Sequence, residues 1–115
     1  MQIALHADNI FIANRWVDFR KSIDGLCALV VAEIKEQPTQ GIYVFYNRAR
    51  NRIKVLGWHG NGFMLIYKRL EKGKFAITEE NQKIKLEQKQ LNWLIAGLDW
   101  QLLSNWENVK FNAYF

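Results

Sequence analysis

A cluster of basic residues in the middle of the chain has the chemistry to bind a polyanion. Between Gly41 and Lys74, eight lysine and arginine residues accompany one acid, Glu71, which leaves +7 there in a chain whose total is +5. Cationic side chains neutralise phosphates, and aromatic rings stack on nucleobases. The candidate nucleic-acid-binding residues are therefore Arg48, Arg50, Arg52, Lys54, Trp58, Lys68, Arg69, Lys72 and Lys74.

The sequence offers no comparable arrangement for catalysis, for a metal ion or for a cofactor. Its eleven acidic residues are scattered, whereas metal-assisted phosphoryl transfer needs carboxylates that converge. His6 and His59 lie in unrelated segments, and we expect His59 to shape a turn. Cys27 falls on the apolar stripe of a predicted helix, where a small buried side chain is usual. We therefore predict a protein that is not an enzyme, with no catalytic residue, metal ligand or cofactor.

The basic cluster lies on segments whose composition predicts β-strands. Each is rich in β-branched or aromatic residues, and polar residues or glycines separate them. Gly60 and Asn61 suit a two-residue hairpin turn. The expected strands, of which the first and last are the weakest, are Ile10–Ala13, Ile42–Tyr46, Ile53–Trp58, Phe63–Leu70 and Phe75–Ile77.

Two other segments repeat apolar residues at the three- and four-residue spacing of a helix. The first runs from Ser22, a suitable N-cap, to Lys35, and the second from about Glu87 to Ala96. The polar stretch 79–90 is interpreted as a solvated approach to the second helix. We predict an α+β fold in which an antiparallel β-meander of three to five strands packs against two helices.

The turn at Gly60 and Asn61 also fixes which residues share a face of the hairpin. Alternate residues point to opposite sides of a strand. One face is aliphatic and should pack against the helices, with Lys68 as a misfit at the sheet's edge. The other face is either an exposed platform or core buried under the second helix or the tail. Its members are Arg52, Lys54, Leu56, Trp58, Phe63, Leu65, Tyr67 and Arg69.

Length and composition bound the remaining possibilities. A chain of 115 residues fits a single domain, in which residues 101–115 form an aromatic tail of unassigned structure. Because Cys27 is the one cysteine, an intramolecular disulfide and a thiolate-rich metal site are both excluded. The sequence shows no secretory signal and no apolar run long enough to span a bilayer. We expect a cytoplasmic protein with no membrane partner, whose oligomeric state the sequence leaves open.

Three segments resemble one known family. The run NRARNRIKVLGWHGNGFMLIYKRLEKGKF, Asn47–Phe75, resembles the signature of the TnpB-type (Orf2) transposase accessory protein of the insertion-sequence-66 family. DFRKSIDGL, Asp18–Leu26, is similar to that family's amino-terminal segment, and LNWLIAGLDW, Leu91–Trp100, is similar to its carboxy-terminal helix ending. Together they cover most of the range Ile10–Trp100, in the expected order.

The resemblance implies a bacterial mobile-element protein that is encoded beside a transposase and assists it in DNA transposition. It implies no catalysis, because in that family the strand-cutting chemistry is ascribed to the separate transposase. Two functions stay open at this point. The protein contacts DNA through the basic hairpin, or it is an interaction module that docks on the transposase of the same element without direct DNA contact.

Overall fold

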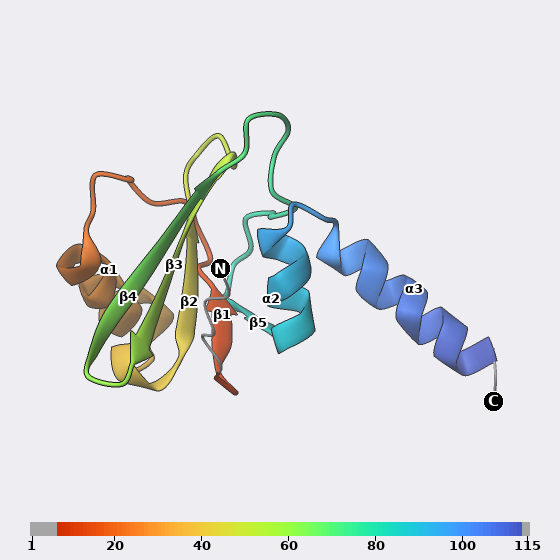
Figure 1. Ribbon diagram of the computed structural model, residues 1–115, viewed down its shortest axis with the longest axis horizontal. Helices are drawn as coiled ribbons and strands as arrows, with labels where there is room; N and C mark the ends of the chain where they lie inside the picture. Colours follow the sequence, from red (N-terminus) through yellow and green to blue (C-terminus); the bar gives the residue numbers. More distant parts are fainter. Residues whose placement is uncertain (1–6, 114–115) are drawn as a thin grey trace.

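The structure is a computed structural model that describes the backbone of residues 7–113 and the side chains of residues 7–107. Its centre is a five-stranded sheet with the strand order β4-β3-β2-β1-β5 (Figure 1). The strands are β1 (Ile10–Ile12), β2 (Ile42–Tyr46), β3 (Arg52–His59), β4 (Gly62–Arg69) and β5 (Ile84–Leu86). The helices are α1 (Ile23–Leu29), which continues as a π-helical segment (Val30–Ile34), a short 3-10 turn (Pro38–Gln40), α2 (Gln88–Ile95) and α3 (Trp100–Ala113).

The predicted α+β class is confirmed, and so is the antiparallel meander of β2, β3 and β4. The turn at Gly60 sets the predicted register, with Trp58 opposite Phe63 and Arg52 opposite Arg69. Gly60 has a φ of 64°, a left-handed conformation that glycine adopts without steric cost and that tight hairpin turns require. β1 joins β2 in parallel through α1, and β5 pairs with β1 in the antiparallel sense.

Both faces of the sheet are covered, and this explains the composition of the central strand. All five residues of β2 are buried, since it has a strand on either side and helices above and below. Tyr43 and Phe45 face α1, where they pack against Leu26. Val44 and Tyr46 face the opposite way into the core beneath α2. Full burial of one such side chain contributes about 1.5–3 kcal/mol.

The two helices do not share the aliphatic face as the sequence analysis expected. α2 does cover that face, where Leu91 and Leu94 pack with Ile53 and Val55. α1 covers the other face instead, because the connection from β1 to a parallel β2 must cross the sheet on one side. The first helix thus packs over the face for which the second helix or the tail was proposed as the cover.

Two local predictions are wrong. Phe75–Ile77 is not a strand, and Phe75 and Ile77 are instead buried in the core beneath α2. The polar stretch 79–90 is not only a solvated approach to a helix, because Ile84–Leu86 within it forms β5. The aromatic tail, whose structure the sequence left unassigned, belongs to α3 as far as Ala113, while Tyr114 and Phe115 lie outside the described residues.

Trp100 anchors α3 to the rest of the molecule. Its ring is buried in the core, and its indole Nε1 donates a hydrogen bond to the carbonyl oxygen of Ala76 at 2.8 Å. Beyond this point the helix extends away from the sheet (Figure 1), and Leu102 is largely exposed. None of the helices in the described part of the chain is long and apolar enough to cross a membrane.

Candidate nucleic-acid interface

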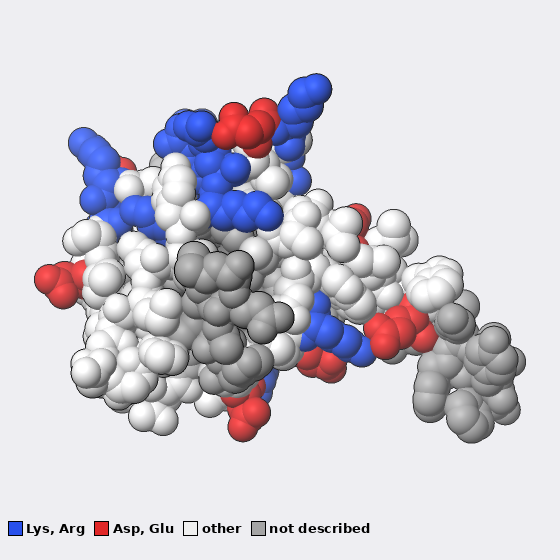
Figure 2. All heavy atoms as spheres, viewed as in Figure 1, with Lys and Arg blue, Asp and Glu red and all other residues white. Residues whose placement is uncertain are grey.

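Basic residues from two connected loops meet at one end of the sheet. β2 ends, β3 begins and β4 ends there, so the β2–β3 loop and the segment after β4 are neighbours. Two backbone hydrogen bonds join them, from Leu70 N to Asn51 O at 2.8 Å and from Phe75 N to Arg50 O at 2.7 Å. Figure 2 shows Lys and Arg side chains crowded along the corresponding upper edge of the molecule. We call Arg48, Arg50, Arg52, Arg69, Lys72 and Lys74 the basic end.

Two asparagines give the β2–β3 loop its shape. The side chain of Asn47 donates to Asn51 Oδ1 at 2.7 Å and accepts from the backbone N–H of Arg52 at 3.0 Å. Arg50 completes the turn with a φ of 61°, a left-handed conformation that costs a residue with a Cβ about 1–2 kcal/mol. The loop is therefore held in a fixed conformation by its own side chains, with Arg48 exposed at its tip.

Arg52 and Arg69 lie directly opposite each other on β3 and β4. Like charges in such a cross-strand pair are destabilising. Glu71 offsets part of the cost, since its carboxylate accepts from Arg69 Nη2 at 2.9 Å and raises the pKa of that guanidinium. Nε of Arg52 is buried and has no hydrogen-bond partner among the described residues. Glu71 thus pairs with only one of these two guanidinium groups, and an added anion would stabilise the other.

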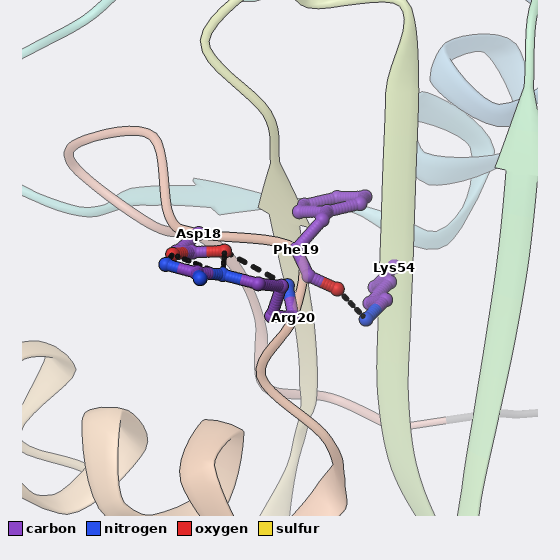
Figure 3. Close-up of polar contacts among 4 residues, drawn as sticks. All are labelled: Asp18, Phe19, Arg20 and Lys54. Atoms are coloured by element: carbon purple, nitrogen blue, oxygen red, sulfur yellow. Dashed lines mark hydrogen bonds and ion pairs between the residues drawn. The ribbon is translucent and has the colours of Figure 1, made fainter.

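Lys54 is occupied within the fold. Its Nζ donates to the carbonyl oxygen of Phe19 at 2.7 Å (Figure 3). It also donates to the carbonyl oxygen of Lys21 at 2.8 Å and lies 5.0 Å from the centre of the Phe19 ring. The contact joins β3 to the loop between β1 and α1. Lys68 has a similar role, because its Nζ donates to the carbonyl oxygen of Ile95 at the end of α2, 2.7 Å away.

The loop that Lys54 holds is itself locked by an ion pair. Arg20 Nη2 lies 2.6 Å from the carboxylate of Asp18, and the backbone N–H of Arg20 donates to the same group at 2.9 Å (Figure 3). The hydrogen bond from Arg20 lowers the pKa of Asp18 from 3.8 to about 2. Because the two charges compensate each other, this part of the loop adds Lys21 rather than Arg20 to the positive surface.

Trp58 lies at the other end of the hairpin from the basic end. It is six positions along β3 from Arg52, a distance of about 20 Å at the usual rise of a strand. Its ring packs edge-on against Phe63, with 4.9 Å between the ring centroids, and remains 40% exposed. Leu56 on the same face is fully buried, and Leu65 is partly buried under α1. This face of the hairpin is therefore buried in the middle of the strands and carries an aromatic pair beside the turn.

Trp16, in the loop between β1 and α1, was not among the residues predicted from the sequence. Its ring is 42% exposed and lies 5.8 Å from the guanidinium carbon of Arg48. The signal was the exposed, basic context of the segment NRWVDFRK, but only the fold brings it beside a loop thirty residues further on.

The described residues contain no group of three or more His, Cys, Asp or Glu side chains that could hold a metal ion. Burial raises the pKa of the Cys27 thiol, with a contribution from Asp24, which disfavours the reactive thiolate. His59 is exposed beside the hairpin turn. The chemistry that the geometry favours is therefore the binding of anionic groups at the basic end.

Comparison with known proteins agrees with the three segments of resemblance. The sequence pattern of the IS66 Orf2-like proteins matches residues 8–105. An uncharacterized protein of Sinorhizobium fredii, y4jC, is 36% identical over 93 residues, which cover 79% of this chain and 80% of the relative. A second from the same organism, y4hO, is 32% identical over 94 residues, or 80% and 82% of the two chains. No solved structure matches. The chain belongs to the family of IS66 Orf2-like proteins, which associates it with insertion-sequence transposition.

Proposed function

We propose that the protein is a non-enzymatic accessory factor of transposition that contacts DNA through the basic end. The observation that carries this proposal is the convergence of six cationic side chains from the β2–β3 loop, the adjoining ends of β3 and β4 and the segment after β4, with Glu71 as the one acid within the segment that supplies them. Folding does not require this arrangement, because it places two like charges, Arg52 and Arg69, opposite each other on neighbouring strands. Phosphates would relieve that repulsion, and the release of counterions would drive association.

The structure sharpens the choice of residues for a test. Lys54 and Lys68 bind carbonyl groups of the chain, so their replacement would confuse lost folding energy with lost DNA contact. Arg48, Lys72 and Lys74 are exposed. The informative variant therefore combines Arg48→Ala, Lys72→Ala and Lys74→Ala, and we call it the basic-end variant.

The basic-end variant should bind duplex DNA more weakly, and the slope of log affinity against log salt should be shallower by about one unit for each lost phosphate contact. A charge-matched control combines Lys35→Gln, Lys85→Gln and Lys89→Gln, which are exposed side chains on other elements. The control should keep the wild-type slope. Equal slopes for all three proteins would contradict DNA contact at the basic end.

A second function is supported by the exposed apolar side chains near the start of α3. Leu98, just before α3, is 48% exposed, and Leu102, in the first turn of α3, is 65% exposed. This helix extends from the body of the molecule (Figure 1). Such side chains suit docking on the transposase of the same element. A pull-down of the transposase that survives high salt and nuclease, and is lost in Leu98→Ser combined with Leu102→Ser, supports docking. Loss of the wild-type association under those conditions assigns it to a DNA bridge.

A further inference from the structure

A hollow beside the basic end combines an exposed aromatic ring with polar side chains. Its volume is about 660 Å³, within the range of small-ligand sites. A backbone hydrogen bond from Glu80 N to Asn14 O, 3.3 Å long, joins its two walls. The residues that line it are Asn14, Arg15, Trp16, Glu79, Glu80 and Asn81.

Trp16 connects this hollow to the basic end. Its ring lines the hollow, while the guanidinium carbon of Arg48 lies 5.8 Å from the ring centroid. A cation over an indole face is favourable and helps to hold the ring in place. An exposed ring beside cations is the arrangement that proteins use to bind single strands, because the ring stacks on bases and the cations hold the backbone.

The two acids of the hollow also lie close to the basic end. Burial raises the pKa of the Tyr46 hydroxyl to about 12, with Glu79 and Glu80 acting in the same direction and Arg50 in the opposite one. All three charged groups are therefore near enough to act electrostatically on one buried residue at the end of β2. Carboxylates repel phosphates, so a bound strand would keep its backbone on the basic end and turn a base toward the acids.

The polar groups favour some bases over others. Carboxylate oxygens accept hydrogen bonds, and Thr78 Oγ1 fixes the Glu80 carboxylate by donating to it at 3.1 Å. The amino groups of adenine, cytosine and guanine are donors that match such acceptors. Thymine has no amino group, and the oxygens on its pairing edge would face the carboxylates.

We propose that this hollow binds an unpaired base of single-stranded DNA, stacked on Trp16 with its amino group toward Glu79 and Glu80 and its phosphates on the basic end. The proposal rests on the proposed DNA contact and adds the strandedness and the class of base. In a duplex each base is stacked on its neighbouring bases, so no base face is free to stack on the ring of Trp16. In a hollow of the same volume near Ala7 and Gln88, none of the described residues that line it is aromatic.

The test compares a labelled single strand of deoxycytidine with a duplex of the same length, by fluorescence anisotropy at one salt concentration. Trp16→Ala should weaken binding of the single strand about 5- to 150-fold, the range that base stacking supplies, and leave binding of the duplex unchanged. Trp16→Phe keeps a flat ring and should retain most of the affinity. Trp106→Ala is the matched control, because Trp106 is also an exposed tryptophan, at 59% against 42% for Trp16, and lies on α3; it should leave both affinities unchanged.

The carboxylates are tested by base preference. Glu79→Gln combined with Glu80→Gln should narrow the preference for deoxycytidine over thymidine strands, since a neutral amide both donates and accepts. Circular dichroism confirms that each variant is folded.

The outcomes separate this proposal from the one on which it rests. Suppose that Trp16→Ala changes the affinities for single strand and duplex equally, or changes neither, while the basic-end variant weakens both. The proposed base site is then wrong, and the proposed DNA contact stands. If the basic-end variant binds both like the wild type, the DNA contact fails, and the base site fails with it.

Discussion

The basic residues of the middle segment divide into side chains that hold the fold and side chains exposed to a partner. Lys54 and Lys68 place their ammonium groups on backbone carbonyls, whereas Arg48 and Lys72 are exposed. The sequence predicted the charge but not this division, because Phe19, whose carbonyl accepts from Lys54, lies 35 residues away along the chain. A role of Lys54 or Lys68 in DNA binding stays a prediction.

Lys54→Met isolates the structural part of this division. Methionine keeps the unbranched stem but leaves the carbonyls of Phe19 and Lys21 without their charged donor. Hydrogen bonds to charged groups contribute about 1.5–3 kcal/mol, so the variant should lose about that much free energy of unfolding, measured by urea denaturation. Lys72→Met, an exposed control, should stay within about 0.5 kcal/mol of the wild type. Equal stability of the two variants would mean that the Lys54 contacts hold nothing together.

The elements that sequence alone predicted are those whose signals are local. The spacing of Ile23, Leu26, Val30 and Ile34 predicted the first helix, which the structure divides into α1 and a π-helical segment. The two turn residues predicted the complete register of β3 and β4. Both signals arise from residues close together in the chain, where period and turn chemistry decide the conformation.

The elements that the sequence did not predict depend on distant partners. β5 is only three residues long, and its single neighbour, β1, lies more than seventy residues earlier in the chain. Phe75 and Ile77 have the composition of a strand but fill the core beneath α2. Trp16 was not predicted as part of the candidate site for the same reason, because Arg48 comes close to its ring only once the sheet has formed.

The junction of β1 and β2 gives a sharp test of the sheet. A Cβ atom at Gly41 would lie 2.6 Å from the carbonyl oxygen of Asn9 and 2.8 Å from the Tyr43 hydroxyl. That same carbonyl accepts from Ile42 N at 2.8 Å, so the clash would push the two parallel strands apart.

Gly41→Ala should therefore cost about 1–3 kcal/mol, as overpacking usually does, with a lower thermal midpoint. Gly62→Ala is the matched control, because a Cβ there meets nothing within 4 Å. Its midpoint should change little. If Gly41→Ala unfolds at the temperature of the wild type, the close approach of β1 and β2 at this junction is wrong.

At the scale of the whole molecule, the charge is strongly asymmetric. The segment that forms the basic end carries +7, and the rest of the chain sums to −2, since the total is +5. Figure 2 shows the resulting concentration of Lys and Arg on one edge. Crowded like charges destabilise a compact state through their mutual repulsion.

This asymmetry predicts that salt stabilises the free protein. Raising the ionic strength from about 0.01 M to about 0.1 M shortens the Debye length from about 30 Å to about 10 Å, which screens repulsion among Arg48, Lys72 and Lys74. Surface ion pairs such as Lys89–Glu107 weaken at the same time, but each contributes little and is shared with the basic-end variant. The thermal midpoint of the wild type should therefore rise more with salt than that of the basic-end variant. If salt raises the thermal midpoints of the two proteins equally, these three cations do not repel one another or their basic neighbours measurably. Relief of that repulsion would then contribute nothing to the binding of a polyanion.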